Sequence, residues 1–361
     1  MFHTPRMPAG IEIRLFDPLT ASRREWAQLH AYRRTRHQED HPGEQLPPEA
    51  DFEHELMQRH PLFEARRLMV VRDGVYVGNL LLGFRRDGSL GCEDHAAFVD
   101  AGGGVLGGLR RLGIGTALLA ALHAFMQDSG RTVATLKIHR PEGHAFMSAI
   151  GARKRYSSVE NRLAMEGLNW VELAQWQAHV AASANGLRWE THAGRVPFDR
   201  LAGLMEPLSV LINEQPLGSL EIPRIRYELQ GYESWYAAMD RRGGDHFLVM
   251  LLHGDDVAAV CDASWDARFA DRVYQQLTAV ARAWRGKGLA KGVKAAMFDL
   301  VRRLHPDVRT VVTNNANTNV AMLSINQRLG FTMHRQDATY QISVDALRRR
   351  LSAPQQTSGD L

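Results

Sequence analysis

Two short stretches, RGKGLAKG at residues 285–292 and RRLGIGTA at residues 110–117, decide the fold of this chain. Each begins with arginine, follows an apolar stretch and opens a segment with helical spacing. A glycine-rich turn that leads into a helix exposes several backbone N–H groups, and the helix dipole adds partial positive charge there. Glycines also let a bulky anion approach the backbone, so both turns predict a site for a phosphate or pyrophosphate.

Neither turn fits the common nucleotide-binding motifs. A Walker A loop needs G-x-x-x-x-G-K-[ST], which both turns lack. The dinucleotide fingerprint G-x-G-x-x-G/A fails because its sixth position is Lys291 in one turn and Leu118 in the other. The sequence therefore disfavours a kinase or a dehydrogenase. For either turn taken alone, a tight strand-to-helix connection without a ligand is the alternative.

The two turns belong to an internal repeat. Arg110 and Arg285 lie 175 positions apart, and the strand-like runs TVATLKI (132–138) and TVVTNN (310–315) lie 178 apart. The glycines that close the two copies lie 179 apart. Landmarks in the same order at a nearly constant offset predict two copies of one domain. The length of 361 residues also suggests two domains.

The pattern of apolar residues predicts the same α/β layout in each copy. A short strand, two helical stretches and a hairpin precede a further strand and the glycine turn, and a helix, a strand, a helix and final strands follow. We expect an N-terminal domain at 1–167, a linker helix or loop at 168–186 and a C-terminal domain at 187–351. Residues 352–361 are expected to be a disordered tail.

Composition excludes several classes of function. Apolar residues make up 45% and charged residues 23% of the chain, and the net charge of +4 is not gathered into a basic stretch, so no nucleic-acid partner is expected. No apolar run or leader-like segment is present, so we expect a cytoplasmic protein without a membrane partner. Cys92 and Cys261 are expected to be reduced thiols, and no metal-ligand cluster is apparent.

The surroundings of the turns carry a resemblance to a known family. R-x-x-G-x-A at 285–290 and R-x-x-G-x-G at 110–115 match the R/Q-x-x-G-x-G/A signature of the GNAT (Gcn5-related N-acetyltransferase) superfamily. TAVAR (278–282) resembles that family's fourth strand, and VVTNNANTNVAMLSINQRLGF (311–331) resembles its fifth strand, an Asn-led helix and the closing Gly-Phe. The chain thus resembles a tandem of two GNAT domains.

The resemblance implies that acetyl-CoA, as co-substrate, lies in a split between the fourth and fifth strands. Its pantetheine arm would bond to the backbone of Val280 and Arg282, and its pyrophosphate would bind the turn. Lys287 and Lys291 would add charge there, or are simply solvated helix residues. Asn319 would contact the cofactor, cap the following helix, or do both. The cofactor-binding residues implied are Val280, Arg282, Arg285, Gly286, Lys287, Gly288, Leu289, Ala290 and Asn319.

The catalytic assignments are less direct. The family's usual acid is a Tyr four residues before the closing Gly-Phe, and here that residue is Asn326, which can donate a hydrogen bond to sulfur but cannot act as an acid. The fourth strand carries glutamines where an acidic base would stand. Asp262, Tyr274 and His253 are the candidates for the base, with a water relay as the alternative.

The first copy departs further from the family. Arg110, Gly113 and Gly115 could form a second cofactor site, but Arg140 replaces the cofactor-contacting Asn. The glycines of DAGGGVLGGLRR (100–111) predict a loosened or bulged fourth strand. We therefore expect the second copy to be catalytic.

The sequence as a whole predicts an acetyl-CoA-dependent N-acetyltransferase. Acetyl would pass to a primary amine of a small molecule or peptide by direct attack in a ternary complex. The alternative is a non-catalytic CoA-binding or regulatory GNAT-fold module. The acceptor should be selected by the loops at 37–48 and 213–224, whose mixed polarity does not identify it.

Overall fold

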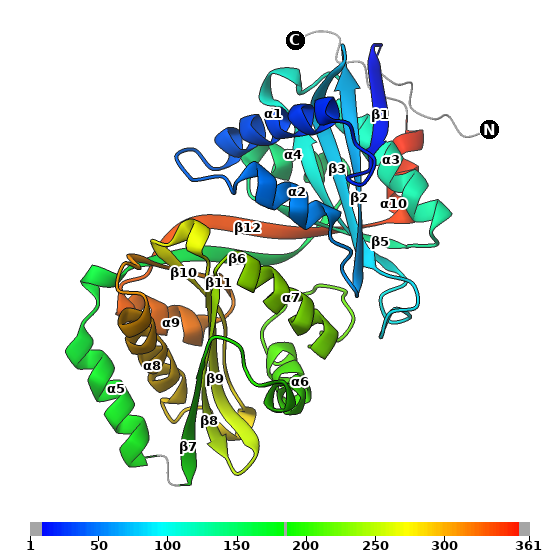
Figure 1. Ribbon diagram of the computed structural model, residues 1–361. Coiled ribbons are helices and arrows are strands. Elements are labelled where there is room, and N and C mark those ends of the chain that lie inside the picture. The colour runs from blue at the N-terminus through cyan, green and yellow to red at the C-terminus, as the bar shows by residue number, and fades with distance from the viewer. Residues whose placement is uncertain (1–8, 184–185, 354–361) are drawn as a thin grey trace. The chain divides into compact units, whose positions relative to one another are not determined.

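The computed structural model describes residues 9–183 and 186–353, which form two compact units (Figure 1). The N-terminal unit runs to Arg155 and resumes at Ala338, whereas the C-terminal unit is Tyr156–Asp337. Each unit contains a mixed, mostly antiparallel sheet flanked by helices, which confirms the predicted fold class. Most of the predicted tail, from residue 354 onward, lies outside the described residues.

The units differ from the predicted boundaries at 167 and 187 because the two copies exchange their last strands. β6 (Arg153–Ala164) follows the first copy in sequence but pairs with β11 (Thr310–Ala316) of the C-terminal unit. β12 (Thr332–Ser343) ends the second copy, yet its C-terminal half pairs with β5 (Val133–Ile138) of the N-terminal unit. Each sheet is therefore completed by a strand from the other copy.

The exchange leaves packing intact in both units. Tyr340 and Ile342 of β12 are buried in the N-terminal core, and Leu163 of β6 is buried in the C-terminal core. The two strands occupy equivalent positions, so either arrangement satisfies the backbone and buries an apolar face. Periodicity is the same for both arrangements and cannot distinguish them.

The N-terminal unit has the strand order β1-β2-β3-β4-β5-β12, in which only β4 and β5 run parallel. Its remaining elements are β1 (Ile11–Phe16), α1 (Arg23–Asp40), α2 (Glu49–Met57), β2 (Phe63–Arg72), β3 (Val75–Arg85), β4 (Phe98–Val105), α3 (Ile114–Asp128), α4 (Pro141–Ala149) and α10 (Val344–Ser352).

The C-terminal unit repeats this plan with the order β6-β11-β10-β9-β8-β7, in which β10 and β11 are the parallel pair. Its remaining elements are α5 (Trp170–Ser183), β7 (Leu187–Ala193), α6 (Phe198–Asn213), α7 (Leu229–Arg241), β8 (Asp245–His253), β9 (Asp256–Trp265), β10 (Arg272–Val280), α8 (Leu289–Leu304) and α9 (Val320–Leu329).

The predicted linker at 168–186 contains a helix, but this helix belongs to the C-terminal core. α5 lies alongside α8 (Figure 1) and buries Leu173, Trp176 and Val180. A Cβ atom on Gly292 of α8 would lie 2.5 Å from a Val180 methyl carbon. Glycine at that position therefore permits the close approach of the two helices.

The two faces of the C-terminal sheet are covered by different helices. Phe247 and Val249 of β8 pack with α5 and α8, whereas Leu248 and Met250 pack with α6 and α7. This alternation along one strand is the period expected when both faces are buried. The faces are referred to below as the α8 face and the α6/α7 face.

A lysine is buried on the α8 face. Lys294 is 1% exposed, and its Nζ donates a hydrogen bond to Oε1 of Gln275 on β10. The amide of Gln275 in turn lies 3.1 Å from the sulfur of Cys261, which is a free thiol like Cys92. Burial lowers the pKa of Lys294 to about 8, whereas the nearby thiol opposes that shift.

This burial predicts a pH-dependent stability. Between pH 8 and 10.5 the unfolded chain binds the Lys294 proton more tightly than the folded chain does, so the free energy of unfolding should rise with pH. Lys294→Met removes the titrating group. The increase in the free energy of unfolding over this pH range should therefore be smaller by about 2–3 kcal/mol in the variant. Urea unfolding at several pH values measures the effect, with Lys291→Met on the same helix as control. Equal slopes for wild type and Lys294→Met would contradict the assignment.

Candidate functional site

The parallel strands of the C-terminal unit separate partway along their length. β10 pairs with β11 from Arg272 as far as Gln275, which lies opposite Thr313. The pairing of β10 with β9 shifts by one residue between Gln275 and Thr278, which is a β-bulge. Beyond the bulge β10 keeps its partner β9 but has lost β11. One edge of the strand is therefore open.

Backbone donors face this open edge. Ala281 donates its N–H to Ala258 on the β9 side, at 2.9 Å. Successive N–H groups of a strand point to opposite edges, so those of Val280 and Thr278 point toward the split. The carbonyl of Val280 accepts a 3.1 Å hydrogen bond from Nε of Arg285, and Arg282 begins the short turn that follows the strand. Of the two predicted pantetheine contacts, Val280 lies on the open edge and Arg282 lies in the turn beyond it; both contacts stay predictions.

The glycine turn has the conformation that its sequence predicts. Gly286 and Gly288 have φ of 79° and 76°, a left-handed conformation that glycine adopts without strain. Gly288 is the N-cap of α8 and makes no side-chain cap, so the amides of Leu289 and Ala290 have no partner within the helix. The turn therefore presents a row of unused donors, as an anion site requires.

The charged side chains of this turn already have neighbours. Arg285 forms a 2.6 Å ion pair with Glu214, just after α6. The Nζ atom of Lys287 lies 4.4 Å from the ring centre of Trp284, and that of Lys291 lies 5.4 Å from the ring of Trp176. Both lysines are thus held near the turn by aromatic side chains.

Asn319 is the N-cap of α9, one of the roles expected for it. Its Oδ1 accepts the N–H of Met322 at 3.3 Å, and its Nδ2 donates to Oε1 of Gln215 at 3.4 Å. Capping holds the amide at the start of α9. A contact with the cofactor stays a prediction.

Asn326 is buried on α9 at 2% exposure. Its Nδ2 donates a 2.6 Å hydrogen bond to Oδ1 of Asn315 on β11, while its own Oδ1 is buried without a partner. An unpaired buried amide oxygen costs free energy. The side chain of Asn326 therefore has an unused acceptor, whereas its Nδ2 already donates to Asn315.

The three candidates for the base occupy different places. Asp262 lies on β9 directly opposite the bulge, and its Oδ1 is 3.3 Å from Nε2 of His246. Tyr274 lies on β10 and pairs with Ser264, one residue before the shift in register. His253 lies at the end of β8 against Trp284 and is remote from the bulge along the sheet. Asp262 is the candidate best placed for chemistry at the bulge.

Sequence reasoning missed the partners of Asp262. Nδ1 of His246 lies 2.8 Å from the hydroxyl of Tyr236, which also accepts the N–H of Val196 at 3.1 Å. The sequence signal was the aromatic-rich stretch YESWY at 232–236. An aromatic helix face is more often core than site, so only the register of β8 and β9 reveals the link to Asp262.

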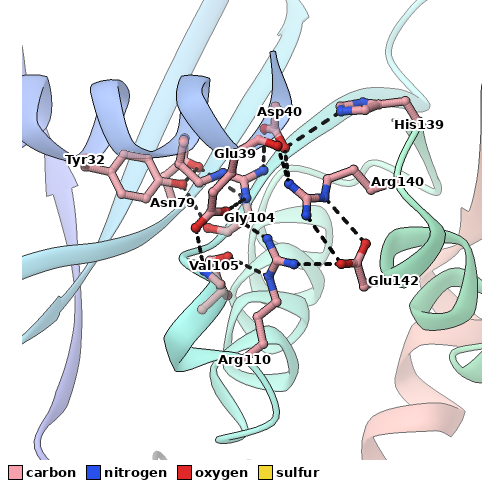
Figure 2. Close-up of polar contacts among 12 residues, drawn as sticks. Tyr32, Glu39, Asp40, Asn79, Gly104, Val105, Arg110, His139, Arg140 and Glu142 are labelled. Carbon is pink, nitrogen blue, oxygen red and sulfur yellow. Dashed lines mark hydrogen bonds and ion pairs between the residues drawn. The ribbon is translucent and has the colours of Figure 1, made fainter. Parts of the chain in front are cut away.

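The corresponding position of the N-terminal unit is filled by its own charged side chains (Figure 2). Arg110 donates to the carbonyl of Val105 at 3.2 Å and to the carboxylates of Glu39 and Glu142 at 2.9 and 3.1 Å. The other oxygen of Glu39 accepts the N–H of Gly107 at 2.7 Å. A carboxylate of the chain thus binds beside the turn where a phosphate would be expected.

A second set of ion pairs adjoins the first. Arg140 binds Asp40 at 3.0 Å (Figure 2). Arg36 contacts both Glu39 and Asp40. Burial raises the pKa of Asp40, but His139, Arg36 and Arg140 outweigh this and lower it to about 2. Three arginines therefore meet three carboxylates at this end of the unit.

The two copies use matching positions differently. Glu39 and Glu214 are separated by the same 175 positions as the two leading arginines, and each pairs with the arginine of its own turn. The charged pair Asp40–Arg140 of the first copy corresponds to the neutral pair Gln215–Asn319 of the second. Both copies thus have the glutamate–arginine pair, but the second contact is an ion pair in the N-terminal copy and a weaker amide contact in the C-terminal copy.

The expected bulge in the first copy is absent from its described residues. β4 pairs with β3 in one continuous register despite its glycines, and the bulge occurs in β10 instead. A Cβ atom on Gly103, whose φ is 131°, would lie 2.2 Å from the carbonyl oxygen of Asn79. Glycine there allows a tight approach of β3 and β4, so it preserves the register that it was expected to break.

Two features are absent from residues 9–183 and 186–353. Within them no group of three or more His, Cys, Asp or Glu side chains could hold a metal ion. Across the same residues no helix has the length and apolar character needed to cross a bilayer.

The ion pairs of the N-terminal unit predict a stability effect. The pKa of Asp40 is lower in the folded chain than its value near 3.8 in the unfolded chain. Asp40 therefore stabilises the fold above pH 3.8, and this stabilisation is lost as pH falls toward 2. Asp40→Asn should lower the free energy of unfolding by about 1–2 kcal/mol at pH 7, with a smaller loss at pH 3. Urea unfolding measures this, and Glu12→Gln in the exposed pair with Arg14 should change it little. A loss independent of pH would argue for packing instead.

Comparison with known proteins supports the fold of the two units. No protein-family model matches the sequence, and no curated protein matches it. Among solved structures, a tandem GNAT protein from the clavulanic acid biosynthesis pathway is 22% identical, with a TM-score of 0.67 over 92% of this chain and 98% of its own. A GCN5-related N-acetyltransferase from Sphaerobacter thermophilus is 14% identical, with a TM-score of 0.64 over 94% and 97%.

A third similar structure is the glucosamine N-acetyltransferase region of a fungal multi-domain GH3 beta-N-acetylglucosaminidase. It is 14% identical, with a TM-score of 0.64 over 93% of this chain and 38% of that protein. At such identities the similarity concerns the fold, which extends over both units. The chain therefore has the fold of the tandem GNAT proteins.

Proposed function

We propose that this protein transfers acetyl from acetyl-CoA to a primary amine, with its C-terminal unit as the catalytic one. The observation that carries the proposal is the open edge of β10 beyond the bulge, which leads directly into the glycine turn. An extended pantetheine arm needs such an edge, and a pyrophosphate needs the unused amides at its end. Solved proteins of this fold include N-acetyltransferases, which supports the same assignment.

The residues present fit acetyl-CoA as a co-substrate. Val280 offers an N–H toward the split, and the amides from Gly286 to Ala290 offer the anion site, with Lys287 and Lys291 adding positive charge. The pyrophosphate would compete with Glu214 for Arg285, an ion pair that is half-exposed and therefore weak. Binding thus requires no buried ion pair to break.

The chemistry needs little from the protein beyond positioning. The neutral amine attacks the thioester carbonyl, and an N–H near Thr278–Val280 stabilises the oxyanion. A C–N bond forms, the C–S bond breaks, and the thiolate takes up a proton that the amine has released. Asn326 can donate a hydrogen bond to sulfur, with water or the ammonium as the source of the proton.

The N-terminal unit is proposed not to bind acetyl-CoA. An incoming pyrophosphate would have to displace Glu39 from both Gly107 and Arg110, and then disturb the pairs of Asp40 with Arg36 and Arg140. These side chains are mostly buried, so the contacts are worth more than surface pairs. One cofactor per chain is the expected stoichiometry.

A non-catalytic CoA-binding or regulatory module is the second candidate. The observation that favours it is Asn326 in place of the family's acid, together with the absence of an acidic side chain on the described strand β10. The two functions differ in turnover. Release of CoA from acetyl-CoA that depends on an added amine supports the enzyme, whereas tight binding without turnover across an amine panel supports the module.

The two N-cap glycines supply a matched pair of variants. Gly288→Glu and Gly113→Glu each place a carboxylate at a left-handed N-cap, so both should cost similar stability. Calorimetric titration of acetyl-CoA should show one site in wild type and in Gly113→Glu, and none in Gly288→Glu. Two sites, or a loss in Gly113→Glu alone, would refute the assignment of the C-terminal unit.

Asn319 allows capping to be separated from cofactor contact. Asn319→Ser keeps an N-cap oxygen, whereas Asn319→Ala removes both the cap and the amide, at a cost of about 1 kcal/mol. If Asn319 contacts acetyl-CoA, both variants should bind it several-fold more weakly, and only the Ala variant should melt at a lower temperature. Wild-type affinity in Asn319→Ser would show that the residue serves the helix alone.

A further inference from the structure

The α6/α7 face of the C-terminal sheet carries five packed rings, hereafter the aromatic cluster: Tyr227, Tyr232, Trp235, Tyr236 and His246. The ring of Tyr232 lies 5.8 Å from that of Tyr227 and 6.1 Å from that of Tyr236. Trp235 meets His246 edge to face at 4.9 Å. These rings come from α7, the residues just before it and β8, so they form one packed cluster on this face of the sheet.

A carboxylate beside the aromatic cluster distinguishes the cluster from ordinary core. Asp262 is 8% exposed, and its one hydrogen-bond partner among the described residues is His246, with no lysine or arginine paired to it. A buried carboxylate without a cation is costly, so such groups are usually paired. The site therefore has negative charge to share with a ligand.

Polar atoms around Asp262 also remain available. Within the described residues the hydroxyls of Tyr227 and Tyr232 make no hydrogen bond, yet neither hydroxyl oxygen is fully buried. The second carboxylate oxygen of Asp262 is likewise not fully buried. Burial raises the pKa of Tyr227 to about 12, with the charge of Asp262 as a smaller cause, and raises that of Tyr232 as well. Both tyrosines are thus neutral donors with electron-rich faces.

Asp262 and the aromatic cluster lie at the level of the sheet where β10 loses its pairing with β11. Asp262 is the β9 residue opposite the bulge, and β10 leaves β11 at Gln275, where the bulge begins. After the bulge Leu277 and Ala279 belong to the same α6/α7 face as the aromatic cluster. A group held by Asp262 is therefore next to the segment assigned above to the thioester.

We propose that Asp262 and the aromatic cluster bind the acceptor as a small primary alkylammonium ion. The inference rests on the proposed function, because it names the acceptor of that same site. A carboxylate gives a charge-assisted hydrogen bond to an ammonium group, and tyrosine and tryptophan faces attract the same cation. An amine that carries its own carboxylate next to the nitrogen would be repelled by Asp262.

The same contact prepares the amine for reaction. The bound ammonium gives one proton to Asp262, and the free amine then attacks the acetyl carbonyl. A second proton leaves nitrogen as the C–N bond forms, the C–S bond breaks, and the thiolate takes it up. The products are the N-acetyl amine, CoA as the thiol and one proton, which Asp262 passes to solvent.

His246 is a positioning residue for Asp262. Its Nε2 must carry hydrogen to donate to the ionised carboxylate, and its Nδ1 can then accept the hydroxyl of Tyr236. Because Tyr236 is itself fixed by the N–H of Val196, this chain of hydrogen bonds holds one oxygen of Asp262 and leaves the other for the ligand.

Calorimetric titration of the full chain with n-butylammonium chloride and with butyltrimethylammonium chloride tests the inference. The second probe cannot be acetylated, so it reports binding alone. Asp262→Asn should weaken both probes by roughly tenfold or more, as expected for a charge-assisted contact. Asp245→Asn is the matched control, because Asp245 also pairs with a histidine, His305, but lies outside the aromatic cluster and should bind as wild type does.

Tyr232 supplies a second test that does not depend on the fold of Asp262→Asn. Tyr232→Phe retains the ring and should keep most of the affinity for butyltrimethylammonium, whereas Tyr232→Leu should lose it several-fold. Acetyl-CoA binding and melting temperature establish that each variant is folded. Equal losses in both Tyr232 variants would overturn the role of the ring.

The outcomes separate the two proposals. If acetyl-CoA binds but both ammonium probes bind wild type and Asp262→Asn equally or not at all, the acceptor inference is wrong and the proposed function stands. If the probes bind through Asp262 but acetyl-CoA does not bind, the cation site stands and the acetyltransferase assignment is wrong.

Discussion

The parting of β10 from β11 at Gln275 is the constraint on which the C-terminal site depends. A parallel pair that stayed together would satisfy its own backbone and leave no edge for an extended ligand. The bulge turns the strand at the same point, so the open edge, the unused amides of the glycine turn and Asp262 are set by one local irregularity. The glycine turn can bind a ligand because it follows directly on the open edge of β10. A similar turn without that edge would only connect a strand to a helix.

The repeat shows how one fold can keep or close such a site with few changes. Both copies have the separated strands, the left-handed glycine N-cap and a glutamate paired with the leading arginine. The copies differ in the side chains that meet across the split. Asp40 and Arg140 are ions that hold each other firmly, whereas Gln215 and Asn319 are neutral amides 3.4 Å apart. A ligand phosphate can displace an amide contact far more easily than a mostly buried ion pair.

Local features of the fold could be predicted from the sequence, and long-range ones could not. The hairpin at Asp73-Gly74 and the left-handed turn at Gly288 follow from the residues themselves, because glycine permits those backbone angles. The exchange of β6 and β12 depends on which of two equivalent positions a strand occupies, and periodicity is identical for both. The link between Asp262 and His246 likewise depends on the register of β8 and β9, which brings together residues 16 positions apart. The bulge was expected in the glycine-rich β4, but glycine there serves close packing against Asn79 instead.

If acetyl-CoA and an ammonium ion bind as proposed, the arrangement of charge in the C-terminal unit would keep them from binding each other. A pyrophosphate is strongly anionic, and an ammonium ion entering the same split would pair with it in an unproductive position. In the C-terminal unit the open amides, Lys287 and Lys291 belong to the glycine turn and the first turn of α8, whereas Asp262, paired only with His246 among the described residues, belongs to the α6/α7 face opposite the bulge. The pyrophosphate would therefore find positive charge at the turn beyond β10, and the ammonium ion would find negative charge at Asp262, opposite the bulge. The thioester, which carries no charge, would lie between them at the bulge, where the amine must attack.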